Sequence, residues 1–430
     1  MKNSVQDLLT REFHIDRDIL ALIEESEKDV SGRFQELDDM MAYNQYKVLA
    51  AFQKNNIRDM HFSWTTGYGY DDAGRDALEQ VYADIFHTEA ALVRPLIVSG
   101  THALTLALTG PLRPGDELIY SSGGPYDTLE EVIGIRGEGK GSLKEFDIEY
   151  KQVELTEKGG IDYDALGKAI GPKTKMVCLQ RATGYAWRKA ITIEEIEEWA
   201  AFVKGINPQI ICMVDNCYGE FLHGKEPTDV GADIMAGSLI KNPGGGIALA
   251  GGYVAGRADL IEKAAYRMTS PGVGSDSGLM FGQTRAMLQG LFTAPKTVNG
   301  AVKGAVLCAR AFEKLGYAIC PGVDDIRSDI IQAVRLGSPE AVTAFCRGIQ
   351  AAAPVDCGVR PVPCDMDGYG DQVVMAAGTF VQGSSIELSA DAPMREPYTV
   401  YFQGGLTYEH AKFGVMKAMQ ELKERGLLNR

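Results

Sequence analysis

Apolar positions along the chain change their spacing within the first hundred residues. Before residue 58, Phe34, Leu37, Val48 and Phe52 recur at roughly helical spacing between charged residues, which predicts helices. From about residue 75, short apolar runs alternate with amphipathic stretches. Because strands that alternate with helices form βαβ units, this pattern predicts an α/β fold whose mainly parallel sheet is covered on both faces.

The strands of this sheet are predicted at six apolar runs: Leu92–Val98, Glu117–Tyr120, Met176–Leu179, Ile210–Val214, Ile234–Ile240 and Ile247–Val254. Helices are predicted between them at Asp127–Arg136, Ile193–Val203 and Arg257–Tyr266.

The remainder of the chain reads as a long helical stretch over 275–318 and a second α+β segment. That segment is predicted to end in strands at Gly378–Ser389 and Tyr398–Gln403 and a helix from about Tyr408 to Leu427. Three parts are therefore predicted: an N-terminal helical arm at 1–60, a large α/β domain at 61–300, and a smaller C-terminal α+β domain at 301–430.

Composition narrows the class of protein. The 430 residues are 45% apolar and 23% charged, as in ordinary globular chains. Lys and Arg total 43 against 58 Asp and Glu, and the net charge of −15 argues against nucleic-acid and anionic-membrane partners. No apolar run reaches the roughly 18 residues of a membrane span, and the N-terminus lacks a secretory signal. The eight cysteines lack metal-site spacing, which favours buried, reduced thiols in a cytoplasmic protein.

The first candidate site lies where a predicted strand gives way to Ser99, Gly100, Thr101 and His102 at the start of a helix. The N–H groups at a helix N-terminus favour a phosphate or a carboxylate. An ordinary helix cap is an equal alternative, because Ser and Thr are common at that position.

Two further candidates end apolar strands. Asp215 follows Ile210–Val214 at the edge of the sheet where ligands bind, and a half-buried carboxylate there needs a cationic partner. Lys241 closes another strand before a glycine-rich turn, and a desolvated lysine can form a Schiff base. Ser238 can offer a hydroxyl to an anion. The alternatives are loop capping for Asp215 and a solvated side chain for Lys241.

Together, these residues resemble the order found in pyridoxal-phosphate (PLP) enzymes of the aspartate-aminotransferase fold. More closely, the chain resembles the bacterial aluminium resistance protein family, a methionine γ-lyase-like group of the Cys/Met-metabolism PLP enzymes. The motifs that carry the resemblance are Gly67-Tyr-Gly-Tyr-Asp-Asp, Ser99-Gly-Thr-His-Ala, Ser238-Leu-Ile-Lys-Asn-Pro-Gly-Gly-Gly and Gln382-Gly-Ser-Ser-Ile-Glu-Leu-Ser-Ala-Asp. The resemblance implies fold type I, with a seven-stranded sheet in the large domain.

The resemblance also implies roles for single residues. Lys241 matches the Schiff-base lysine, and Asp215 matches the partner of the cofactor's pyridine nitrogen. Tyr126 matches an aromatic ring stacked on the cofactor, with simple packing as the alternative. Tyr70 matches a residue that reaches cofactor and substrate in a neighbouring subunit. The residues matched to the phosphate are Ser99, Gly100, Thr101 and Ser238.

The sequence departs from the family pattern at several positions. Ile240 stands where many relatives have a hydroxyl residue, and Arg75 lies farther from Tyr70 than the usual arginine. The late strand at 398–403 has no arginine for the substrate carboxylate. Arg395 is the predicted replacement, with Arg360 in reserve, because a guanidinium suits a carboxylate. His102 is expected either to cap its helix or to touch the cofactor ring.

The resemblance implies a PLP-dependent carbon–sulfur lyase for an amino acid such as cystathionine, cysteine or methionine. The substrate amine would displace Lys241 from the Schiff base, and the freed lysine would take the α-proton before a thiol is eliminated. Other PLP chemistry, namely transamination, racemisation or aldol cleavage, stays open, as does a non-catalytic stress or binding protein. The resemblance further implies a dimer with shared sites, or a tetramer. No metal is expected, because Asp71-Asp72 and Asp324-Asp325 read as solvated turns.

Overall fold

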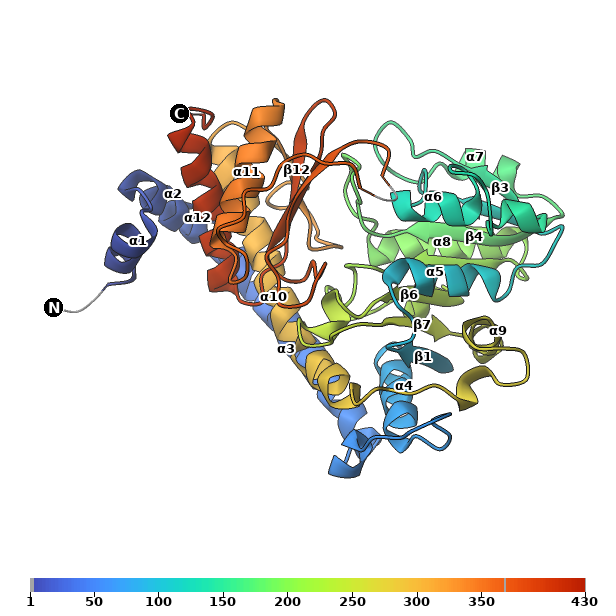
Figure 1. Ribbon diagram of the computed structural model, residues 1–430. Coiled ribbons are helices and arrows are strands. Elements are labelled where there is room, and N and C mark those ends of the chain that lie inside the picture. The colour runs from blue at the N-terminus through green and yellow to red at the C-terminus, as the bar shows by residue number, and fades with distance from the viewer. Residues whose placement is uncertain (1–3, 367–368, 430) are drawn as a thin grey trace. The chain divides into compact units, whose positions relative to one another are not determined.

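The structure, a computed structural model, describes residues 4–366 and 369–429 (Figure 1). Contacts within the chain divide it into two compact units. The large unit comprises residues 43–184 and 189–295, and the small unit comprises the described parts of 1–42, 185–188 and 296–430. The predicted division at residues 60 and 300 stays a prediction.

The large unit is built on a seven-stranded sheet of strand order β1-β7-β6-β5-β4-β2-β3. Its strands are β1 (Ala90–Arg94), β2 (Glu117–Tyr120), β3 (Glu149–Gln152), β4 (Thr174–Gln180), β5 (Ile211–Asp215), β6 (Ile234–Ser238) and β7 (Gly252–Gly256). Neighbouring strands from β3 to β6 are parallel, whereas β7 is antiparallel to both β1 and β6. The predicted α/β class and the seven-stranded, mainly parallel sheet are confirmed.

Helices of the large unit follow the strands in the expected alternation. They are α4 (Ala73–Ile85), α5 (Gly100–Thr109), α6 (Asp127–Ile133), α7 (Tyr163–Ala169), α8 (Ile193–Ile206) and α9 (Ala258–Met268). Short 3-10 turns are η1 (Asp59–Phe62), η2 (Lys144–Phe146), η3 (Pro227–Val230), η4 (Asn242–Gly244) and η5 (Gly274–Asp276). Helix α5 packs across β6 and β7 (Figure 1), which brings its N-terminus to the end of β6.

Apart from edge strand β3, the sheet is buried on both faces. Met176 and Cys178 of β4 belong to a core cluster with residues of α5, α6 and α9, while the intervening Val177 and Leu179 are also fully buried. Continuous apolar strands of this kind are typical of a parallel sheet between two helix layers. The arrangement leaves the strand ends as the positions for polar side chains.

The small unit holds a five-stranded antiparallel sheet of order β10-β11-β12-β9-β8. Its elements are α1 (Val5–Phe13), α2 (Arg17–Asp29), β8 (Ala318–Cys320), β9 (Gln332–Arg335), α11 (Pro339–Ala352), β10 (Val373–Ala376), β11 (Ser389–Pro393), β12 (Thr399–Gln403) and α12 (Tyr408–Glu424). Helices α11 and α12 pack against each other, and α11 also packs on the sheet (Figure 1). Helices α3 (Ser31–Lys54) and α10 (Thr284–Lys314) each contribute residues to both units.

Two expectations about these elements are wrong. A strand was predicted at Gly378–Ser389, but residues 378–388 are turns and irregular structure, and the strands lie on either side as β10 and β11, the latter beginning at Ser389. The Glu387 carboxylate accepts hydrogen bonds from the backbone N–H groups of Phe380 and Val381. In this segment a side chain therefore accepts the bonds that a neighbouring strand would otherwise accept. Of the cysteines, 178, 212, 217, 308 and 346 are buried as expected, but Cys357 and Cys364 are exposed.

Across the described part of the chain, none of the helices combines the length and the apolar character needed to cross a bilayer.

Candidate active site

Strands β5 and β6 and helix α5 of the large unit bring polar residues together at one edge of the sheet. Strand β5 ends at Asp215, whose register partner on parallel β6 is Ala236, so Ser238 and Lys241 follow at the same edge of the sheet. Helix α5 starts beside them at Gly100, where an added Cβ would lie 3.2 Å from the Ser238 Cβ and 3.7 Å from the Cys217 Sγ. A side chain at position 100 would therefore press on Ser238, and glycine lets the start of the helix approach this strand end closely.

The start of α5 has the form of an anion cradle. Ser99 is the N-cap, and its Oγ accepts the N–H of His102 at 3.0 Å. The first N–H groups of a helix have no acceptor within it, which leaves those of Gly100 and Thr101 for a ligand or water. The Ser238 Oγ lies near Gly100 and accepts the N–H of Ile240 at 3.3 Å. Two helix N–H groups and a hydroxyl thus converge.

His102 serves the cap of α5. Its Nδ1 accepts the backbone N–H of Val98 at 3.2 Å. Partial burial lowers the pKa of His102, which keeps the ring neutral and able to accept this bond. Thr101 is half-buried, and its hydroxyl pairs with that of Thr128 at 2.8 Å. These bonds hold the turn between β1 and α5 in place.

Lys241 and Asp215 are electrostatically coupled. Burial raises the pKa of Asp215, and Lys241 acts in the opposite direction. Burial disfavours the charged form of Lys241, but Cys217, Tyr218, Asp215 and Glu220 outweigh it and raise the pKa of the ammonium above its ordinary value. The Asp215 Oδ1 also accepts the N–H of Cys217 at 3.1 Å. Without a ligand, Lys241 is therefore a cation facing a buried carboxyl group.

Tyr218 is a site residue that the sequence did not suggest. The Lys241 Nζ lies 4.1 Å from the centroid of its ring, within the range of a cation–π contact. Tyr218 has φ of 70°, in the left-handed region that non-glycine residues rarely adopt. Such backbone strain is concentrated at functional sites, where the surrounding structure holds it in place.

Tyr126 caps α6 and is half-buried. A Cβ added at Gly184 would lie 3.5 Å from the Tyr126 Cδ2, so the segment after β4 runs beside this ring. Its predicted stacking on a cofactor stays a prediction. Tyr70 is 57% exposed and stacks on Tyr68, with ring centroids 5.4 Å apart. Arg75, by contrast, is buried and donates from Nη1 to the Gly69 carbonyl at 2.6 Å.

Both arginines predicted for the substrate carboxylate lie in the small unit, where each holds a carboxylate. Arg395 pairs with Asp371 at 2.9 Å, and Arg360 pairs with Glu421 at 3.1 Å. A substrate would have to replace these partners, and both assignments stay predictions.

Behind β6 lies a buried polar network that the sequence did not suggest. Glu220 and Tyr253 are fully buried, and the Tyr253 hydroxyl donates to the Glu220 Oε1 at 2.8 Å. Asn216 links this pair to a buried ion pair. Its Nδ2 donates to the Tyr253 hydroxyl at 3.4 Å and to Glu226 at 3.2 Å, and its Oδ1 accepts from Arg181 at 2.7 Å. No spacing rule marks Glu220 in advance, since its burial depends on β7.

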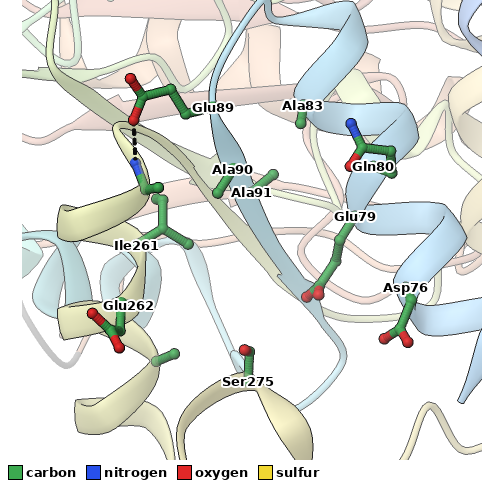
Figure 2. A pocket seen from close by; sticks show the side chains of 12 residues that line it. Asp76, Glu79, Gln80, Ala83, Glu89, Ala90, Ala91, Ile261, Glu262 and Ser275 are labelled. Atoms are coloured by element: carbon green, nitrogen blue, oxygen red, sulfur yellow. Dashed lines mark hydrogen bonds between the residues drawn. The ribbon is translucent and has the colours of Figure 1, made fainter. Parts of the chain in front are cut away.

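A pocket elsewhere on the large unit, with a volume of about 320 Å³, contains none of the predicted cofactor residues. Figure 2 shows that Asp76 and Glu79 line it from α4, Glu262 from α9, and Glu89 from the turn just before β1. Glu89 accepts the backbone N–H of Ala258 at 2.8 Å, and Glu79 pairs with Arg94 at 2.6 Å. No metal-binding group of three or more His, Cys, Asp or Glu side chains occurs in residues 4–366 and 369–429.

Comparison with known proteins gives consistent matches. The family model described as "Methionine gamma-lyase" matches residues 19–423. The uncharacterized protein YnbB of Bacillus subtilis (strain 168) is 53% identical over 94% of this chain and 96% of its own length. The crystal structure of a carbon–sulfur lyase involved in aluminum resistance, from Clostridium novyi NT, has a TM-score of 0.94 and 50% identity, covering 98% of this chain and 100% of that one.

A more distant structure shares the fold alone. The pyridoxal-5'-phosphate dependent protein YhfS from Escherichia coli has a TM-score of 0.61 at 16% identity, covering 90% of this chain and 97% of that one. Fold type I is therefore confirmed, and solved neighbours of this fold are PLP-dependent.

The donors present suit PLP, which needs a phosphate cradle, an amine for its aldehyde and a carboxylate for its ring nitrogen. The α5 start with Ser238, the Lys241 amine, and the buried Asp215 carboxyl supply these three groups at one sheet edge. With the family model covering nearly the whole chain and half or more of the residues identical to close relatives, this chain belongs to the methionine gamma-lyase family.

Proposed function

We propose that the protein is a PLP-dependent carbon–sulfur lyase that acts on a sulfur amino acid such as cystathionine, cysteine or methionine. The observation that carries the proposal is that Lys241 and buried Asp215 follow neighbouring strands at one edge of the sheet, are electrostatically coupled, and lie beside the start of α5 and Ser238. The name of the Clostridium novyi relative, a carbon–sulfur lyase, supports the choice of reaction.

When bound, PLP supplies an aldehyde that condenses with amines and a ring that withdraws electrons from the substrate's α carbon. Gly100, Thr101 and Ser238 would hold the phosphate, and the Asp215 carboxyl group would lie opposite the ring nitrogen, where its negative charge would stabilise a positive charge on that nitrogen. The Lys241 Nζ takes the α-proton of the substrate, as a general base close to the reacting carbon. Cleavage of the carbon–sulfur bond would release the sulfur with a proton, as a thiol or, from cysteine, as hydrogen sulfide, and uptake of one water would give a 2-oxo acid and ammonia.

We further propose that the active protein is a homo-oligomer. Tyr70 is 57% exposed, Tyr68 is 74% exposed and Trp64 is 73% exposed, so this segment presents aromatic surface to solvent. Exposed aromatic residues in one segment favour contact with another protein surface. A second copy of the chain fits the family resemblance, in which Tyr70 reaches a neighbouring site.

The absorption spectrum of the protein with PLP tests the cofactor assignment. A lysine-bound cofactor gives a visible band, and the addition of a sulfur amino acid should shift it as the substrate amine replaces Lys241. Other PLP chemistry would give the band with different products. A protein that forms no band with PLP in excess would be a binding or stress protein instead.

Replacing Ser238 with alanine should weaken PLP binding by about tenfold, because one charge-assisted hydrogen bond to the phosphate is lost. Equilibrium titration of the apo-protein with PLP measures the change. The exposed Ser275, which lies on the separate acidic pocket, gives the matched control Ser275→Ala. Equal affinities in the two variants would contradict a phosphate role for Ser238.

Loading of the apo-protein with PLP should accelerate as pH rises from about 7 to about 9. The pKa of Lys241 is raised, so its amine is protonated at neutral pH, and only the neutral amine attacks an aldehyde. The neutral fraction therefore grows with pH throughout this interval. Stopped-flow absorbance at the visible band gives the rate, and a rate that declines over this interval would contradict the assignment.

A further inference from the structure

Glu220 is a carboxyl group that the proposed reaction does not yet use. It is fully buried, and only its Oε1 has a hydrogen-bond partner, the Tyr253 hydroxyl, among the residues that the structure describes. The absence of a side chain at Gly237 makes room for this pair, since an added Cβ would lie 2.7 Å from the Glu220 Oε1 and 2.8 Å from the Tyr253 hydroxyl. Gly237 immediately precedes Ser238 on β6. The carboxyl group therefore sits directly behind the strand that leads to Lys241.

The backbone around Glu220 is tied to the lysine segment. The Asn242 side chain, next in sequence to Lys241, donates from Nδ2 to the Glu220 carbonyl at 3.0 Å. Glu220 and Lys241 also interact electrostatically, because Glu220 favours the ammonium form of Lys241 and Lys241 favours the ionised form of Glu220. The hydrogen bond therefore joins the backbone of Glu220 to the residue after Lys241, and the electrostatic interaction couples the two side chains.

The other titratable groups around Glu220 come from several elements. Those that interact with it are Tyr82 on α4, Tyr253 on β7, and Cys217 and Glu226 on its own loop. Arg181 is paired with Glu226 at 3.6 Å, and Lys241 interacts electrostatically with Asp215, so each of these two cations already has a carboxyl group as its counterpart. A charge on Glu220 would be a third negative charge in a buried network, and an uncharged Glu220 leaves the network balanced.

We propose that Glu220 is a positioning residue for Lys241, and that gain or loss of its proton sets how readily the lysine amine gives up its own. The proposal rests on the proposed function of Lys241. Burial raises the pKa of Glu220 to about 8, so that the carboxyl group is mostly protonated at neutral pH. Above this pH it ionises, and its charge then holds Lys241 in the unreactive ammonium form.

The rate of PLP capture by the apo-protein tests this coupling in the wild type and in Glu220→Gln. The ratio of the two rates at each pH cancels the titrations of PLP itself. At about pH 6 the ratio should be near one, because glutamine resembles the protonated carboxyl group. As the pH rises through about 8, Glu220→Gln should capture PLP increasingly faster than the wild type. The difference should reach about tenfold if ionised Glu220 raises the pKa of Lys241 by about one unit. A ratio that does not change with pH would overturn the proposal.

Two further variants separate this effect from a change in packing. Tyr253→Phe removes the donor to Oε1, which favours ionised Glu220, so the slowing by Glu220 should begin at higher pH than in the wild type. Glu262→Gln, at an exposed glutamate of α9 bonded to Tyr266, should follow the wild type at every pH. The proposal would also be overturned if the pH at which the slowing is half complete were the same in Tyr253→Phe as in the wild type. If wild type itself captures no PLP, it is the proposed function that fails.

Discussion

Replacing Lys241 with alanine is expected to abolish both the visible absorption of the PLP-loaded protein and the release of thiol. Lys241 is the amine that binds the aldehyde and the base that takes the α-proton, so one substitution removes two roles. Turnover should fall by at least about a thousandfold, in line with the loss of a positioned general base. Absorbance and a thiol assay on the same samples measure both effects.

Lys263 supplies the matched control for this experiment. It lies on α9, is half-buried and pairs with Asp259 at 3.3 Å, a contact of the kind that contributes little to stability. Lys263→Ala should keep both the visible band and the thiol release of the wild type. A Lys241→Ala protein that retained either property would refute the assignment of the lysine.

Asp215→Asn should uncouple PLP loading from turnover. Asparagine preserves the acceptor for the Cys217 N–H but removes the negative charge. Because Asp215 raises the pKa of Lys241, its loss lowers that pKa, and loading at neutral pH should become faster. Turnover should nevertheless fall by about a hundredfold to a thousandfold, the usual effect of losing a preorganised electrostatic group.

The rates of PLP loading and of thiol release should be measured on the same preparation of Asp215→Asn. Together they distinguish the loss of one charge from a general disturbance of the site. Asp259→Asn, at an exposed position of α9, should leave both rates unchanged. A fall of both rates in Asp215→Asn would indicate a disturbed site, and unchanged turnover would mean that Asp215 does not face the cofactor ring.

The sequence predicted those parts of the fold that depend on local apolar runs. Strands β2, β4, β5 and β6 lie within two residues of the predicted runs, because a buried parallel strand is apolar at nearly every position. Strand β3, Glu149–Gln152, was missed because it lies at the sheet edge, where its side chains are largely exposed and polar. Strand β7 begins only at Gly252, since the apolar residues before it form the loop after Lys241.

The site residues that could be predicted are likewise those marked by local sequence patterns. Asp215 and Lys241 could be predicted because each follows an apolar strand at the edge of the sheet. Glu220 could not, because its environment is created by Tyr253, 33 residues away along the chain. Tyr218 was also missed, since its contact with Lys241 depends on a left-handed backbone conformation that a single sequence does not reveal.

The most direct test of the proposed reaction is the product ratio when the PLP-loaded protein is incubated separately with cystathionine, cysteine and methionine. The account predicts that at least one of them yields a 2-oxo acid and a thiol, or hydrogen sulfide in the case of cysteine, in equal amounts, and that Lys241→Ala yields neither. A PLP-loaded protein that shifts its visible band with these amino acids but releases no thiol and no hydrogen sulfide from any of them would contradict the account.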